Sequence, residues 1–109
     1  MPGLRRSGRI GLGRRGEALA ARRLEAEGYR ILARNYRCQV GEVDLVAEDG
    51  ECLVFVEVRT RRGVEWGTPE ESVTSAKQAR LLQVAERYLA EHELWNVDWR
   101  IDVVAIDMD

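Results

Sequence analysis

The chain has 109 residues, of which 45% are hydrophobic and 33% charged, and its formal net charge is −2 at pH 7. This length suits one domain with a single core, and no apolar run is long enough to span a membrane. The N-terminus has no apolar signal-peptide core, and Cys38 and Cys52 form neither a CxxC motif nor a zinc pattern. We therefore expect a cytoplasmic protein with reduced cysteines.

The charges are distributed unevenly along the chain. Residues 1–37 contain ten arginines and three acids, whereas the remainder contains seven basic and sixteen acidic residues. A basic segment of this kind suits a surface that faces phosphates, although charge alone favours a solvated tail with a charged helix face. Lys77 is the single lysine against sixteen arginines, which indicates a general preference for arginine in this sequence.

Residues 1–12 contain three glycines and no periodic pattern, so we expect a flexible basic arm ahead of one domain at 13–109. The spacing of apolar residues predicts a helix from Arg14 to Glu27, closed by Gly28. Glu17 lies on or beside the packed face of this helix. It is either a site residue or an acid that complements the helix dipole in the first turn.

Two apolar runs at 41–47 and 52–59 flank Asp49-Gly50, and together they predict a hairpin after a first strand at 29–36. With a two-residue loop of Asp49 and Gly50, Asp44 opposes Phe55 and Glu42 opposes Glu57.

This register places Glu42, Asp44, Glu57 and Arg59 on one face of the hairpin, with Asp44 and Glu57 as diagonal neighbours. Carboxylates that are half buried beside each other cost free energy unless a cation or a proton intervenes. A divalent metal, an ion pair with Arg59 and partial protonation remain three open explanations.

The rest of the chain predicts a polar loop at 60–71 with one helical turn near its end, then a helix from Thr74 to Glu91 with capping-box spacing from Ser75 to Gln78. A last strand follows at 99–106. The order of helix, three strands, helix and strand predicts an α/β sheet flanked by helices.

An acid on the first helix, an aspartate on one strand and a Glu-x-Arg on the next form a recognisable constellation. The chain resembles the YraN-like family of small bacterial proteins, which are grouped with the PD-(D/E)XK nucleases and the archaeal Holliday-junction resolvases. The resemblance covers nearly everything from Gly13 to Ile106. The stretches that carry it are Gly16-Glu17-Ala18, Asn35-Tyr36-Arg37, Gly41-Glu42-Val43-Asp44-Leu45-Val46-Ala47, Phe55-Val56-Glu57-Val58-Arg59-Thr60-Arg61, Lys77-Gln78 and Ile101-Asp102-Val103-Val104.

The resemblance implies a restriction-endonuclease-like core with a mixed sheet, and a catalytic set of Glu17, Asp44, Glu57 and Arg59. Asp44 and Glu57 would hold Mg²⁺ or Mn²⁺ through oxygen ligands, and Glu17 would complete or support the metal shell. Arg59 stands where the family usually has lysine. Arginine cannot act as a base but binds a phosphoryl oxygen bidentately, so Arg59 either clamps the phosphate or marks a degenerate site.

The same resemblance implies DNA as the partner, and branched DNA among its substrates. We expect contacts with DNA from the side chains of Arg14, Arg15, Arg61, Lys77 and Gln78. For Lys77 the alternative is an exposed lysine in a first helical turn, and for Gln78 an ordinary capping role.

The functional expectation is therefore a metal-dependent endonuclease that hydrolyses phosphodiester bonds in DNA. A module that binds nucleic acid without cutting it and a protein-interaction module are the alternatives. The sequence leaves open whether the chain forms a homodimer.

Overall fold

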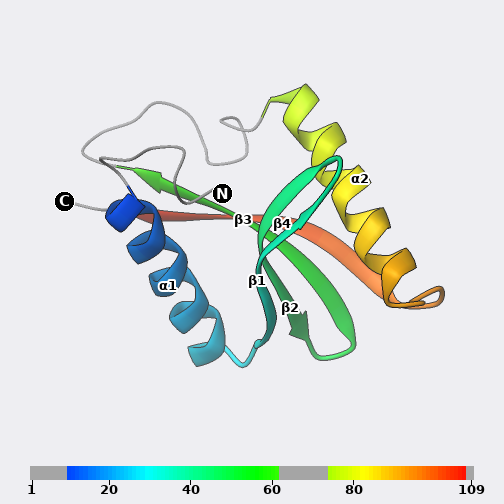
Figure 1. The fold of residues 1–109 in the computed structure, drawn as a ribbon. Helices are drawn as coiled ribbons and strands as arrows, with labels where there is room; N and C mark the ends of the chain where they lie inside the picture. The colour runs from blue at the N-terminus through cyan, green and yellow to red at the C-terminus, as the bar shows by residue number, and fades with distance from the viewer. Residues whose placement is uncertain (1–9, 62–73, 108–109) are drawn as a thin grey trace.

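The structure, a computed structural model, describes residues 10–61 and 74–107, with the side chains of 10–14 and 61 outside the described set. Its elements occur in the order expected from the sequence (Figure 1). No helix in these two ranges is long and apolar enough to cross a membrane. The bounds are α1 (Ile10–Ala26), β1 (Arg30–Cys38), β2 (Gly41–Asp49), β3 (Cys52–Arg61), α2 (Ser75–Glu91) and β4 (Asp98–Asp107).

Several element ends differ from the expected ones. Helix α1 begins at Ile10, so residues 10–12 of the expected arm are helical, while residues 1–9 lie outside the described residues. Strand β3 continues to Arg61, and the helical turn expected before α2 also lies outside the described residues. The N-cap of α2 is Thr74 rather than Ser75. The Thr74 hydroxyl accepts a hydrogen bond of 3.2 Å from the backbone N–H of Lys77, which satisfies a donor that the helix leaves free.

The sheet has the strand order β1-β2-β3-β4 and is mixed, as expected. Strands β1, β2 and β3 pair antiparallel, and β4 pairs parallel to β3. A parallel pair needs a crossover connection, and α2 lies within that connection. Helix α1 packs on one face of the sheet and α2 on the other.

The hairpin of β2 and β3 has a different register from the expected one. Asp49 pairs with Cys52, so the turn consists of Gly50 and Glu51 rather than Asp49 and Gly50. Gly50 has φ 61° at the first central position of this turn, where a type II′ hairpin turn requires glycine. The register therefore shifts by two residues. Its continuation places Asp44 opposite Glu57, not opposite Phe55.

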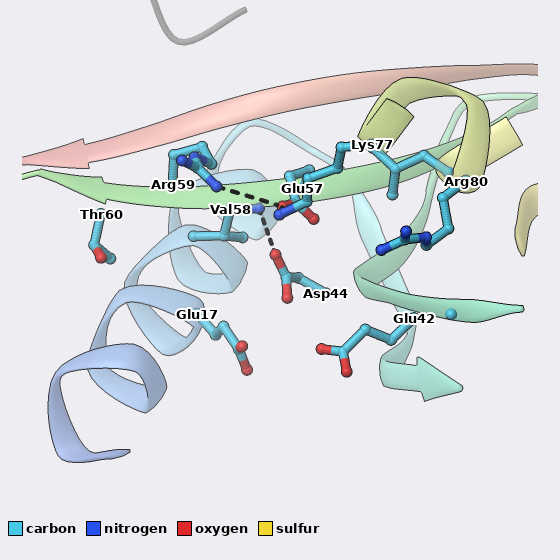
Figure 2. A pocket seen from close by; sticks show the side chains of 11 residues that line it. Glu17, Glu42, Asp44, Glu57, Val58, Arg59, Thr60, Lys77 and Arg80 are labelled. Carbon is cyan, nitrogen blue, oxygen red and sulfur yellow. Dashed lines mark hydrogen bonds and ion pairs between the residues drawn. The ribbon is translucent and has the colours of Figure 1, made fainter. Parts of the chain in front are cut away.

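Strand β2 leaves β3 at this point. The paired residues run from Asp49↔Cys52 to Leu45↔Val56, and beyond them the Asp44 carboxylate accepts a hydrogen bond of 2.7 Å from the backbone N–H of Val58 (Figure 2). The Asp44 side chain thus satisfies a backbone N–H that a partner strand would otherwise satisfy. The strict alternation expected for β2 is wrong here, because Val43 and Val46 contribute to the same core.

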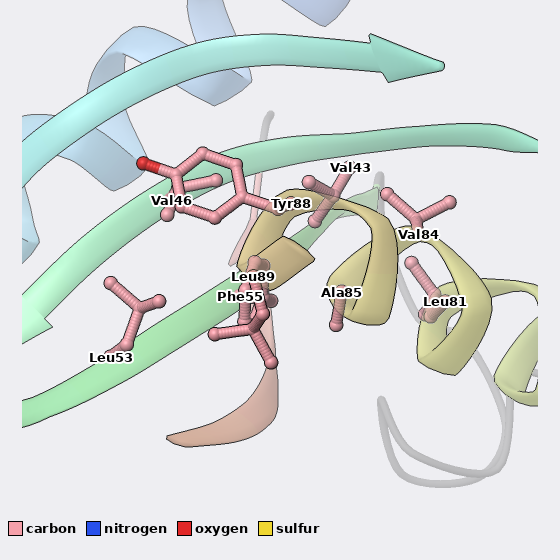
Figure 3. Close-up of a cluster of buried hydrophobic side chains, with 9 residues drawn as sticks. All are labelled: Val43, Val46, Leu53, Phe55, Leu81, Val84, Ala85, Tyr88 and Leu89. Atoms are coloured by element: carbon pink, nitrogen blue, oxygen red, sulfur yellow. The ribbon is translucent and has the colours of Figure 1, made fainter. Parts of the chain in front are cut away.

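Strand β3 is buried on both faces, since alternate residues enter two cores. Leu53 and Phe55 pack against α2, whereas Val54 and Val56 pack against α1. Phe55 lies at the centre of the larger core, with its ring edge-to-face against Tyr88 at 5.5 Å between centroids. Figure 3 shows this core, which comprises Val43, Val46, Leu53, Phe55, Leu81, Val84, Ala85, Tyr88 and Leu89.

Candidate functional site

A pocket of about 320 Å³ opens where β2 leaves β3 (Figure 2). Four elements line it: α1 from one side, α2 from the other, and the two strands between them. It collects Glu17, Asp44, Glu57, Arg59 and Lys77, five of the residues expected from the sequence. The full lining is Glu17, Gly41, Glu42, Asp44, Glu57, Val58, Arg59, Thr60, Lys77, Arg80 and Leu81.

Asp44 and Glu57 are the buried charged residues of the described chain, with exposed fractions of 7% and 5%. Burial and, to a smaller extent, the neighbouring charge of Glu57 raise the pKa of Asp44 from 3.8 to about 8, while the hydrogen bond from the Val58 N–H acts in the opposite direction. Glu17 adds a smaller repulsion. The pair is therefore a place where a proton or a cation is strongly favoured.

Two cations approach Glu57, and Lys77 is much the closer one. Its Nζ lies 2.6 Å from Glu57 Oε2, whereas Arg59 Nη1 lies 3.9 Å from the same oxygen. The Lys77 side chain is 39% exposed, so it lies at the rim of the pocket and reaches inward. Sequence reasoning assigned the internal ion pair to Arg59 alone, and the structure adds Lys77 from the other side of the pocket.

The donor set suits a hard cation held by two carboxylates. Magnesium is commonly bound through one or two carboxylates, with waters and substrate phosphates in the other positions, and Asp44 and Glu57 face a pocket with room for them. Within residues 10–61 and 74–107, no group of three His, Cys, Asp or Glu side chains is arranged to hold a metal. Glu17 thus lines the pocket and repels Asp44 without completing a three-ligand group.

Of the other expected DNA contacts, those whose side chains the structure describes lie outside the pocket. Arg15 and Gln78 are exposed and lie outside its lining, while the side chains of Arg14 and Arg61 lie outside the described residues. Sequence reasoning missed Arg80, which does line the pocket. Its position three residues after Lys77 on the same helix was the available signal, because residues at this spacing are neighbours on a helix surface.

Gly16 allows α1 to approach β3 closely enough to bring Glu17 into the pocket. A Cβ atom at Gly16 would overlap the methyl group of Thr60. The position is buried, so neither α1 nor β3 has free space on this side. Gly16 therefore determines how near Glu17 comes to the carboxylate pair.

Gly16→Ala should lower stability by up to about 2 kcal/mol, because overpacking costs 1–3 kcal/mol and the better helix propensity of alanine returns about 1 kcal/mol. Chemical unfolding measures this effect. Thr60→Ser removes the opposing methyl group. When Gly16→Ala is introduced into the Thr60→Ser variant, it should therefore no longer lower stability. A purely additive double variant would mean that this contact does not set the position of α1.

Known proteins are similar in sequence to this chain over most of its length. The sequence profile described as "Uncharacterised protein family UPF0102" matches residues 16–106. A UPF0102 protein of Roseiflexus castenholzii is 54% identical over 101 residues, which cover 92% of this chain and 82% of that protein. A UPF0102 protein of Beutenbergia cavernae is 55% identical over 95 residues, covering 87% and 80% respectively. The matched region includes every residue that lines the pocket.

Proposed function

The chain belongs to the UPF0102 family, and from the pocket built by its fold we propose that it is a divalent-metal-dependent nuclease that acts on DNA. The observation that carries this proposal is the pair of buried carboxylates, Asp44 and Glu57, facing an open pocket with cations at its rim. Two acids in such a position cost stability without a cation. Buried acids with strongly perturbed pKa values that line a cleft are typical of functional sites.

Asp44 and Glu57 would hold Mg²⁺ or Mn²⁺ in this proposal. When bound, such an ion lowers the pKa of a coordinated water and offsets charge on a phosphate. Lys77 and Arg59 supply positive charge beside Glu57, where they orient a phosphate group and balance its charge. Glu17 adds negative potential that favours positive charge at the carboxylate pair. Arg59 acts in this site as a fixed charge, because arginine stays protonated.

The ion pair between Lys77 and Glu57 favours a second candidate function. At 2.6 Å, Lys77 neutralises Glu57 without any metal, as a purely structural network would. A protein that binds DNA without cutting it would need no more than this arrangement and its exposed arginines. The two candidates differ in whether a divalent ion binds and whether DNA is cleaved.

Cleavage of a panel of linear, flapped and four-way DNA, with and without Mn²⁺, tests the nuclease directly. We expect cleavage that requires the metal and disappears in Glu57→Gln, which removes the acid but keeps its shape. Binding of DNA by the native protein without cleavage of any substrate would exclude the nuclease and leave the binding module.

The affinity for Mn²⁺ should rise with pH and level off near pH 8. Below that pH the Asp44 carboxyl is largely protonated, and the ion must displace this proton before it binds. The apparent association constant should therefore increase by up to about tenfold per pH unit between pH 6 and 8. Titration calorimetry in several buffers measures both the affinity and the proton release. A pH-independent affinity would show that Asp44 is not the titrating ligand.

A further inference from the structure

A second depression, of about 390 Å³, lies directly beside the acid pocket. The two share Gly41, Glu42 and Arg80, so they adjoin each other, and together they form a hollow that extends from the carboxylate pair to the β1–β2 turn. The lining of the second depression is Arg37, Cys38, Gln39, Val40, Gly41, Glu42 and Arg80.

The sign of the charge changes along this hollow. The acid pocket contains four carboxylates and three cationic side chains, whereas the second depression contains two arginines and one carboxylate. A phosphodiester backbone is repelled by the first set unless a cation is present, and it is attracted by the second. The hollow thus offers a cation site followed by an anion site.

Arg80 lies at the boundary between the two depressions, and its stem is held in place. A Cβ atom at Gly41 would lie 2.9 Å from Cδ and 3.0 Å from Cγ of Arg80, so the absence of this atom lets the stem lie against β2. Figure 2 shows the side chain reaching from α2 toward the side of the pocket where Glu42 and Asp44 lie. Across the described ranges, its guanidinium makes no hydrogen bond or ion pair. A confined stem loses less rotamer freedom when the guanidinium binds a ligand.

We propose that Arg80 binds a second DNA phosphate, adjacent to the one at Asp44 and Glu57, and that the strand continues along the depression beside the β1–β2 turn. This inference rests on the proposed function and adds the path of the strand. A guanidinium is suited to this role because its planar donors bind phosphate oxygens bidentately. Contacts of this kind fix the register of DNA without reading its sequence.

The test is equilibrium binding of the full chain to fluorescent single-stranded DNA in EDTA, measured by anisotropy over a range of salt concentrations. Each phosphate contact contributes roughly 0.7 to the slope of log affinity against log salt for single strands. Arg80→Ala should lower the slope by that amount. Arg23→Ala is the matched control, because Arg23 is exposed on the other helix and forms an ion pair with exposed Glu27. This control should keep the native slope.

A single methylphosphonate, moved along the strand, locates the contact. At one position it should weaken binding by the native protein but leave Arg80→Ala unaffected, since the charge it removes has no partner in the variant. If Arg80→Ala keeps the native salt slope and is weakened by the methylphosphonate as the native protein is, the Arg80 assignment is wrong. The nuclease proposal would still stand. An equal decrease of the salt slope in Arg23→Ala would also overturn the Arg80 assignment. Absence of salt-dependent DNA binding by the native protein in EDTA would also overturn the Arg80 assignment, while cleavage with Mn²⁺ tests the nuclease proposal separately.

Discussion

Asp44→Asn should make the metal-free protein more stable than the native one at pH 9, by on the order of 5 kcal/mol, and leave stability at pH 4 nearly unchanged. Burial and the charge of Glu57 raise the pKa of the folded Asp44 from 3.8 to about 8. The folded state therefore binds this proton more tightly than the unfolded state. The stability from this group is complete below about pH 4 and is lost as the pH rises through about 8. Asparagine resembles the neutral carboxyl at every pH.

Chemical unfolding in EDTA between pH 4 and 9 measures this difference. Asp98→Asn is the matched control, because Asp98 is an exposed carboxylate at the start of β4, and its difference from the native protein should stay flat. Parallel stability curves for Asp44→Asn and the native protein would show that Asp44 does not carry the buried proton.

Manganese should narrow the stability difference between the two proteins at pH 8. A ligand present at one hundred times its Kd stabilises the state that binds it by about 2.7 kcal/mol. The native protein should gain this stability, and Asp44→Asn should gain much less because it lacks one of the two carboxylates. Equal gains in both proteins would place the metal elsewhere.

Lys77→Met should reduce metal-dependent DNA cleavage by about 10²–10³, the usual cost of losing one group that stabilises a developing charge. The variant keeps most of the apolar stem and removes the cation that lies 2.6 Å from Glu57. Arg59→Ala should reduce the rate less, because Arg59 is 3.9 Å from the same oxygen. Lys77→Arg should keep a large part of the activity, since a fixed charge at this position is enough for a clamp.

The stability of the same variants distinguishes the two candidate functions. Lys77→Met should also cost about 1 kcal/mol of stability, a modest value because the lysine is partly exposed and its ion pair is screened by solvent. If the native protein does not cleave DNA and Lys77→Met only lowers the melting temperature, the cluster is a structural network. If Lys77→Met cleaves as fast as the native protein, Lys77 is not part of the site.

The order of the elements could be read from the sequence, because helices and strands of this kind follow from local patterns. Apolar residues at three- and four-residue spacing predicted both helices, and runs of Val, Leu and Phe predicted the central strands. The crowding of Glu42, Asp44, Glu57 and Arg59 was also visible there. It followed from the expected alternation of side chains and from a tight turn near Gly50, although the register of that turn differs by two residues.

Only the tertiary structure decided how these acids meet. The register shifts by two residues because the turn places Gly50 first, and β2 then leaves β3 so that Asp44 bonds to the Val58 N–H. No local pattern marks where two strands part, since the parting depends on how α1 and α2 pack against the two faces of the sheet.

The tertiary structure also decided which cationic side chains lie beside the carboxylates. Lys77 is twenty residues from Glu57 in sequence, and the packing of α2 places its ammonium closer to that carboxylate than Arg59, which is two residues away. Gly16 and Gly41 matter only because Thr60 and Arg80 lie against them in the folded chain. The sequence determined which charges are present and on which elements. The close packing of those elements, which no segment specifies alone, determined which charges touch.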